Sequence, residues 1–518
     1  MSKFPATTLA NYGRRFLYSL KRSSAILDWV PARYLQPAAM IVVSATIIFI
    51  YFSPVFEGYT FSDIGNRQKG LYPWVYRSGD RIAPLHYDQA DSFYPWQVFI
   101  GRALRSGEVP LWDPLSFAGH PFFANGQNGA FYPPRTYLSF VVSASRVHDT
   151  LVISHMLLGG LLMFFLLRSS RLCFGACLFG GLAWMLNSFM LSWMALGHFL
   201  VIEAFLPLSF LLVEKVVRGS LPSALGLGLV LAAIFLGGNL LFVELTLVTV
   251  AMYGVYLLYR RWRRPERRSL TLNVPRAAWV ILLLGLTGAI CVGLIAVQFL
   301  PTAEIVGAMD RSTLSYTELV KWNLPLYELR CFFFEPIHEI TTSTAIGQEP
   351  YHRMMFLGTP TAILALVGFW RRHKLVGYLR VLAVLALLAA LGTFLTWIAM
   401  KLIPGFGHLK PLGRVLFLFN FAIAVLAAFG LDWVLRGVPR LLHWKPAGAL
   451  RHTWRLGLSA VLVIIVSIQM YSVASWVVRY QVDHGDQLYP ETPLITALGH
   501  DDSTRMIAIH PSFYGSTP

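Results

Sequence analysis

Charged residues are scarce in this chain. Asp, Glu, Lys and Arg make up 13% of its 518 residues, whereas hydrophobic residues make up 56%. A soluble globular chain carries roughly 25% charged residues, so this chain lacks the charge to cover a water-facing surface. Several apolar runs reach about 18 residues, the length that crosses the roughly 30 Å hydrocarbon core of a bilayer. In lipid such runs must be helical, because every backbone polar group needs an internal partner. The composition predicts an all-α polytopic membrane protein.

Cysteines and familiar enzyme signatures are also few. Cys173 and Cys177 share one apolar run, Cys291 lies in another, and Cys331 lies in a long loop. This spacing gives neither a disulfide framework nor a zinc site. The sequence has no Walker motif, no G-x-S-x-G and no three-ligand metal spacing. These absences exclude the nucleotide-binding, hydrolase and zinc classes that such motifs define.

The N-terminus has no cleavable signal peptide by its pattern. The first apolar run begins near Pro37, behind a basic head over 1–36. A secretory signal is shorter and ends in small residues, so this run is predicted to stay in the membrane. Eleven spans are predicted within a transmembrane domain over 37–478. They lie near 38–55, 148–167, 172–190, 198–214, 222–237, 240–259, 277–299, 355–370, 376–397, 413–434 and 457–477.

The net charge of +17 is distributed in short basic clusters between the apolar runs. The clusters in 260–268 and 371–374 fall on one side when eleven spans are counted, as the positive-inside rule expects. This count places the N-terminus inside and the C-terminus outside, with long outer loops near 56–147 and 301–354. The tail over 479–518 begins like a soluble module. A clustered pattern of this kind argues against nucleic-acid binding.

The first outer loop contains a predicted amphipathic helix. Its apolar residues recur at helical spacing, as Trp96, Phe99, Ile100, Ala103 and Leu104. Pro95 suits the first turn, Arg102 and Arg105 suit the last turn, and Gly107 suits the end. A short helix with one apolar face next to a span is expected to lie in the membrane interface, at the rim of a cavity.

Two carboxylates precede this helix. Asp91 or Ser92 is placed to cap it, whereas Asp88 lies beyond capping reach and is predicted to be functional. Downstream, the turn-rich segment from Gly119 to Pro134 is expected to pack against another surface. Its aromatic and amide side chains suit a sugar ring, and packing on the bilayer rim is an equal alternative.

Five pieces follow one another in 84–138: Asp88, Tyr94-Pro95, the segment from Gly107 to Pro114, Gly119-His120-Pro121 and Tyr132-Pro133. This order resembles the YfhO-like bacterial membrane proteins, which look like members of the GT-C glycosyltransferase superfamily. Weaker matches follow in order, at Gly197-His198, Leu206-Pro207-Leu208, Pro301 with Glu304, Arg311-Ser312, and Pro404-Gly405-Phe406 with Arg414.

The resemblance implies transfer of a sugar from a polyprenyl-phosphate donor on the outer face of the bacterial cytoplasmic membrane. The acceptor would be an envelope polymer, a lipid or a protein. It also implies an acidic base in the first outer loop, where Asp88 matches and Asp91 is the second candidate. Many such enzymes carry this acid directly after the first span. Asp88 lies some thirty residues beyond it, and Glu57 and Asp63 are nearer.

The departing lipid phosphate needs a cation, since it gains charge. Lys410 and Arg414 are the first candidates, because they are basic residues on the outer side. Anchoring to lipid headgroups is their alternative role. Arg311 and Arg353 are weaker candidates. Asp88 and Asp91 can also hold a divalent cation with waters.

Five ionisable residues fall within or near the outer halves of spans and are candidates to line a cavity: His155, His198, Glu203, Glu244 and Glu304. Placing an acid within the membrane costs free energy, so such acids usually line a cavity or pair with each other. Two non-enzymatic alternatives remain open at this point. One is a transporter or flippase of lipid-linked saccharides, although no internal repeat is seen. The other is a scaffold in envelope assembly.

Overall fold

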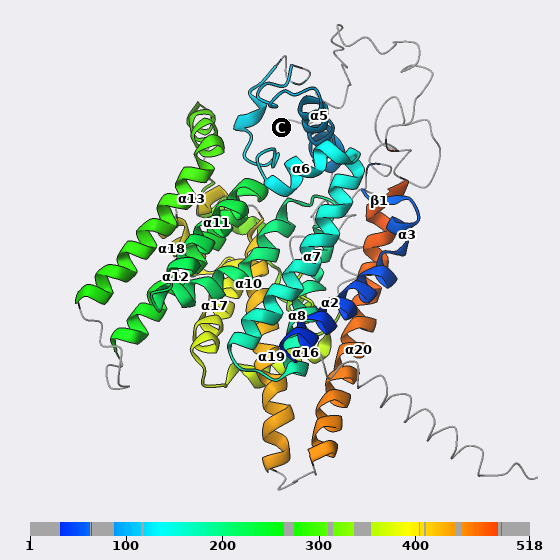
Figure 1. The fold of residues 1–518 in the computed structure, drawn as a ribbon, viewed down its shortest axis with the longest axis vertical. Helices are drawn as coiled ribbons and strands as arrows, with labels where there is room; N and C mark the ends of the chain where they lie inside the picture. The colour runs from blue at the N-terminus through cyan, green and yellow to red at the C-terminus, as the bar shows by residue number, and fades with distance from the viewer. Residues whose placement is uncertain are drawn as a thin grey trace, which may run out of the picture.

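A computed structural model describes residues 32–62, 64, 88–114, 116, 119–263, 274–308, 314–335, 354–403, 405–408, 411–441, 448–484 and 488. Its long helices are α2 (Ala32–Tyr51), α7 (Ala144–Ser169), α8 (Phe174–Met185), α10 (His198–Val217), α11 (Leu221–Gly237), α12 (Leu240–Trp262), α13 (Val274–Ala308), α16 (Thr359–Phe369), α17 (Lys374–Ala390), α19 (Leu416–Leu441) and α20 (Gly448–Gln481). They form one bundle (Figure 1).

Short elements connect these helices. They are α3 (Ser53–Phe56), η2 (Gln89–Phe93), α5 (Tyr94–Arg105), η3 (Phe122–Ala124), α6 (Pro133–Val141), α9 (Ser188–Ser192), α14 (Tyr316–Leu319), η4 (Val320–Trp322), η5 (Leu326–Phe332), α18 (Phe394–Leu402), η8 (Phe406–His408) and η9 (Leu412–Val415). The strands β1 (Tyr59–Phe61) and β2 (Val482–His484) pair antiparallel, with Thr60 opposite Asp483. The predicted all-α membrane architecture is confirmed apart from this small ladder.

Seven helical segments in the described residues are long and apolar enough to cross a membrane, or eight if a bent pair counts as one span. The bent pair is α16 and α17, whose axes turn through 117°. α10 is long enough to cross a membrane but is not among the seven, because every 18-residue stretch of it contains three charged residues, Glu203, Glu214 and Lys215. The total of eleven spans therefore stays a prediction, although a helix occupies each of the eleven segments.

α8 and α19 form the centre of the bundle and are almost entirely buried, whereas α2, α13 and α20 lie at its edge. Glycines let two helices meet at backbone distance. A β-carbon at Gly368 of α16 would lie 1.8 Å from the Leu426 carbonyl oxygen of α19. A β-carbon at Gly430 of α19 would lie 2.0 Å from the Leu364 carbonyl oxygen of α16. Close approach at small residues is how helices associate where lipid offers no hydrophobic driving force.

The bundle has two chemically different ends. At one end, which we call the basic end, α7, α10 and α12 finish with basic residues. There Glu214 of α10 forms ion pairs with Lys374 of α17 and with Arg218, and it accepts a hydrogen bond from Tyr253 of α12. At the other end, the loop end, α5, α6 and the residues between them cover the helices (Figure 1). The clustering of basic loops on one side, predicted from the sequence, is thus present in the fold.

Candidate functional site

The loop end contains a cavity of about 830 Å³ with a mixed polar and apolar lining, which we call the loop cavity. One wall is α5, a second is the segment from Asp113 to Gln127, and a third is formed by the start of α12 and the end of α13. Its chemistry is mixed, with carboxylates, an imidazole, amides and aromatic rings: Asp91, Trp96, Phe99, Asp113, His120, Asn125 and Gln127. This mixture suits a ligand with many hydroxyl groups and apolar ring faces.

Side chains of α13 hold the floor of the loop cavity in place. Gln298 Nε2 donates to the carbonyl oxygens of Phe123 and Asn125, at 2.9 and 2.8 Å. One turn further on, Thr302 Oγ1 donates to the carbonyl oxygen of Ala124 at 2.8 Å. Three consecutive carbonyls thereby find donors on one helix face, although the Asn125 carbonyl also accepts from the Asn128 N–H at 3.4 Å. The turn-rich loop was predicted to pack against another surface, and this prediction is confirmed.

α12 holds the same loop from a second side. Asn239 Nδ2 donates to Gln127 Oε1 at 3.1 Å, while Asn239 Oδ1 accepts from the Leu241 N–H and caps α12. Gly126 lies so close to Leu240 that a β-carbon there would be 2.8 Å from the Leu240 side chain. The loop cavity is therefore shaped by fixed contacts to α12 and α13.

Asp113 and His120 form a backbone pair within the lining. The Asp113 N–H donates to the His120 carbonyl at 2.9 Å, and the His120 N–H donates to the Asp113 carbonyl at 3.0 Å. Directly opposed residues of an antiparallel pair project to the same face, roughly 4.5–5.5 Å apart at their β-carbons. Gly119 turns the chain with φ +101° and lies against the Trp112 ring. The sequence motifs contained both residues, but neither was predicted as a site residue.

The two predicted aspartates have different positions. Asp88 and Asp91 are both exposed, but only Asp91 is among the residues that line the loop cavity. The prediction that Asp91 or Ser92 caps the helix is wrong. A π-helical turn over Gln89–Phe93 runs directly into α5, so Asp91 lies inside a helical turn and the cap position of α5 is Phe93.

The amphipathic helix itself is confirmed over Tyr94–Arg105, with Gly107 at φ +79° after its end. Its apolar face packs on the loop: Ile100 is fully buried with Phe122 and Ala130, while Trp96 lines the loop cavity.

Arg414 lies where the sequence predicted, at the start of a helix. It is part of the η9 turn, which continues into α19, and its guanidinium carbon lies 5.8 Å from the centre of the Trp193 ring. The half-buried Arg414 is thus positioned by a cation–π contact. The other cationic candidates, Lys410, Arg311 and Arg353, and the alternative acid Asp63, lie outside the described residues.

The two predicted histidines lie beside the loop. His155 is buried, its Nε2 lies 2.6 Å from Tyr132 Oη and its Nδ1 lies 2.7 Å from the Leu151 carbonyl. Both ring nitrogens are occupied, so His155 fixes Tyr132 of the loop on α7. His198 is buried and stacks on Phe93, with ring centres 4.6 Å apart.

None of the three predicted intramembrane acids lines the loop cavity. Glu203 is fully buried in α10, where Oε1 accepts a hydrogen bond from Asn187 at the break between α8 and α9. Asn187 Oδ1 in turn caps α9 by accepting from the Met190 N–H at 3.0 Å. Glu304 is exposed on α13, beside Ile305, which does line the loop cavity.

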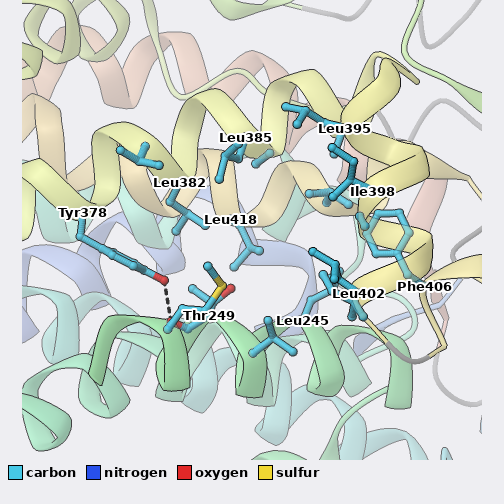
Figure 2. A pocket seen from close by; sticks show the side chains of 18 residues that line it. Leu245, Thr249, Tyr378, Leu382, Leu385, Leu395, Ile398, Leu402, Phe406 and Leu418 are labelled. Atoms are coloured by element: carbon cyan, nitrogen blue, oxygen red, sulfur yellow. Dashed lines mark hydrogen bonds between the residues drawn. The ribbon is translucent and has the colours of Figure 1, made fainter. Parts of the chain in front are cut away.

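Glu244 lies next to a second cavity, the apolar pocket, of about 360 Å³. α12, α17, α18 and the start of α19 form this pocket, and nearly all of its lining is aliphatic (Figure 2). The Tyr378 hydroxyl points toward α12, where it donates to the Thr249 carbonyl at 2.6 Å (Figure 2). Such a surface suits a hydrocarbon chain.

Within the part of the chain that the structure describes, no three His, Cys, Asp or Glu side chains come together as a metal site would require. The divalent cation therefore stays a prediction.

The fold and the two cavities define a helical multi-pass membrane protein with a cavity of mixed polar and apolar lining at one end and an apolar pocket between its helices. A comparison with protein-family models and with curated proteins found no match.

Proposed function

We propose that this protein is a membrane glycosyltransferase of the GT-C type, which moves a sugar from a polyprenyl-phosphate donor to an acceptor of the bacterial cell envelope. The observation that carries the proposal is the loop cavity, where Asp91, Asp113 and His120 line one space with amides and aromatic rings. The order of loop motifs that resembles the YfhO-like proteins supports the same function. The basic residues at the opposite end of the bundle support an orientation in which the loop end faces away from the cytoplasm, since basic loops favour the inner side.

The chemistry follows from the lining. In an inverting transfer, an acceptor hydroxyl oxygen bonds to the anomeric carbon while the bond from that carbon to the phosphate oxygen breaks. The bonding electrons leave with the lipid phosphate, and the hydroxyl proton passes to a carboxylate. We assign this base to Asp91, because it lines the loop cavity and Asp88 does not. Asp113 is the second carboxylate within the same space.

A cation must meet the charge that develops on the leaving phosphate. Arg414 supplies a planar fork of donors for two phosphate oxygens. Arg414 belongs to the short η9 turn that begins at Leu412, and unpaired backbone N–H groups at the start of a helix favour an anion.

The test is release of the carrier lipid. The purified protein in lipid nanodiscs is given a panel of polyprenyl-phosphate-linked sugars and a bacterial envelope extract, and mass spectrometry measures free polyprenyl phosphate. Asp91→Asn is expected to slow release by about 10²–10⁴-fold, the usual contribution of a general base. Glu108→Gln, which changes an exposed acid outside the loop cavity, is the matched control. If Asp91→Asn keeps full activity and Asp88→Asn loses it, the general base is Asp88 and not Asp91. If no donor in the panel releases polyprenyl phosphate, the proposed function is wrong.

A transporter of lipid-linked saccharides is the second candidate. The observation that favours it is the break between α8 and α9 at Asn187, inside a segment long enough to span, bonded to the buried Glu203. Transporters use discontinuous helices of this kind at their binding sites. A transporter would move a fluorescent lipid-linked sugar between leaflets of a liposome without releasing polyprenyl phosphate.

A further inference from the structure

Two layers of aromatic rings hold α10 and α12 face to face. In the first layer, the rings of Phe199 of α10, Phe242 of α12 and Phe417 of α19 contact one another, with centres between 4.6 and 5.6 Å apart. In the second layer, nearer the basic end, the rings of Phe210 of α10 and Tyr253 of α12 stack with centres 4.6 Å apart. The same faces of α10 and α12 are therefore in contact from one layer to the next.

Glu203 of α10 and Thr246 of α12 lie between these two layers. Each comes four residues after a ring of the first layer and seven residues before a ring of the second. Positions with this spacing share one face of a helix, so both residues are on the contacting faces of α10 and α12. Asn420 of α19 comes three residues after the Phe417 ring. The amide of Asn187 links the side chains of Asn420 and Glu203, because it bonds to both.

Each of these three residues has an oxygen atom without a hydrogen-bond partner among the described residues: Glu203 Oε2, Thr246 Oγ1 and Asn420 Oδ1. All three side chains are fully buried. Asn420 Nδ2 donates to Asn187 Oδ1 and to the Met354 carbonyl, which fixes the orientation of the Asn420 amide. Buried oxygens nearly always meet a donor or a cation. Three orphaned oxygens between the same two layers therefore indicate a bound group.

The chemistry of these oxygens favours a monovalent metal cation. A carboxylate, a hydroxyl and an amide oxygen are hard ligands, which bind hard cations and not metals that prefer sulfur or imidazole. The single carboxylate balances one positive charge, whereas a divalent ion would leave an uncompensated charge between apolar rings. Sodium is also bound beside discontinuous helices at membrane depth, and α8 and α9 are interrupted at Asn187.

We propose that Glu203, Thr246 and Asn420 bind a sodium ion within the helix bundle. The ion balances the charge of the Glu203 carboxylate, which is costly at membrane depth without a partner. It also connects α10, α12 and α19 beside the break between α8 and α9. The site requires neither the loop cavity nor a lipid-linked donor, so sodium binding is independent of the proposed function.

Direct binding to the full-length protein in nanodiscs tests the proposal. A scintillation-proximity assay follows radioactive sodium at constant ionic strength, which choline chloride maintains. We expect saturable binding that unlabelled sodium displaces. Thr246→Val keeps the shape of the side chain and removes one ligand oxygen, so the Kd for sodium should rise about 10-fold, the loss of one contact to a charged group. Glu203→Gln still accepts from Asn187 but removes the charge, so saturable binding should disappear.

Thr361→Val is the matched control. Thr361 is also fully buried, but its hydroxyl bonds within α16, to the Leu357 carbonyl, so this variant should bind sodium like the unchanged protein. If Glu203→Gln does not fold, the comparison of Thr246→Val with Thr361→Val decides. The proposal is wrong if the unchanged protein shows no saturable binding, or if Glu203→Gln binds equally well, because water or a proton then satisfies the three oxygens. An equal loss of binding in Thr361→Val also contradicts it, because packing would then cause the loss.

Discussion

Asn187 joins the break between α8 and α9 to Glu203 of α10, by donating from Nδ2 to the Glu203 carboxylate while Oδ1 caps α9. Asn420 of α19 donates to the same Oδ1 at 3.4 Å and to the Met354 carbonyl at 3.1 Å. One amide therefore connects three helices at a point where the backbone is not helical. Irregular backbone is tolerated at membrane depth only where protein groups satisfy it.

We expect Asn187→Ala to lower the free energy of unfolding by about 2–4 kcal/mol, since it removes a cap and leaves a buried acceptor without its donor. Glu203→Gln should cost less, because an amide oxygen still accepts from Asn187. Unfolding in mixed micelles, followed by tryptophan fluorescence, measures both. A stable Glu203→Gln protein that binds donor but no longer acts on it would show that the Glu203 carboxyl group has a functional role.

Thr302→Val is expected to loosen the floor of the loop cavity. The variant keeps the volume of the side chain but removes the donor to the Ala124 carbonyl, at a cost of about 1 kcal/mol. Faster amide exchange over 121–128 in hydrogen–deuterium exchange is the predicted readout. Thr46→Val is the matched control, because the Thr46 hydroxyl bonds only within its own helix, to the Val42 carbonyl. Unchanged exchange in Thr302→Val would mean that Gln298 alone fixes the loop.

The proposed orientation predicts opposite labelling of the two ends of the bundle. Glu108 is exposed at the loop end and Ser169 is exposed at the basic end of α7. In a background without the native cysteines, a membrane-impermeant maleimide should label Glu108→Cys in intact cells and Ser169→Cys only after lysis. Labelling of both positions from outside would contradict the proposed orientation and the site of transfer.

Arg414→Ala should weaken donor binding and slow release of polyprenyl phosphate. Arg414→Lys should recover part of the effect, because the charge remains while the two-pronged geometry and the stacking on Trp193 are lost. Donor affinity and single-turnover rate distinguish a phosphate contact from an anchor to lipid headgroups. If Arg414 only anchors the protein to lipid headgroups, Arg414→Lys should behave like the unchanged protein, and Arg414→Ala should lower thermal stability more than turnover.

We expect the protein to lose stability in acid because of His373, which lies in the turn before α17. Burial, followed by the charge of Lys374, lowers the pKa of His373 below its ordinary 6.5, with Arg260 acting in the same direction and Glu214 against it. His373 Nδ1 accepts from the Leu375 N–H at 3.3 Å, which requires the neutral ring. Stability from this group is complete above pH 6.5 and falls below it, because the unfolded state then takes up a proton that the folded state resists.

His373→Asn keeps a capping acceptor and removes the titrating ring. The difference between unfolding midpoints at pH 7.5 and pH 5.5 should therefore shrink in this variant. An unchanged difference would assign the acid sensitivity to other groups.

Short-range signals predicted the local elements well. Pro95 and Gly107 bracket α5 as expected, and the apolar runs coincide with helices. The exception near Asp91 has a long-range cause: Gln89 Nε2 donates to the Phe61 carbonyl, which holds the π turn against β1 and extends the helix beyond its expected cap.

The sequence could not predict which residues line the loop cavity, because contacts between distant segments decide this. Gln298 meets the Asn125 carbonyl across 173 residues of sequence, and no periodicity in either segment encodes that meeting. Asp113 and His120 come together through a local bridge, but their shared space with Asp91 exists only once α13 has docked. Glu244 could be predicted as an intramembrane acid, whereas its position beside Gly405, where a β-carbon would lie 2.6 Å from Glu244 Oε2, depends on the fold.

The pairing of β1 with β2 has a consequence for biosynthesis. β1 follows the first described helix and β2 follows the last, and the Tyr51 hydroxyl donates to the Ser467 carbonyl, 416 residues along the chain. During synthesis, Asp149 can hold the Thr60 hydroxyl and the Phe61 N–H soon after α7 emerges. The edge of β1 that pairs with β2 then stays unpaired until almost the whole bundle has been synthesised. Contacts of such long sequence separation form late, so the nascent protein carries an open strand edge through most of its insertion.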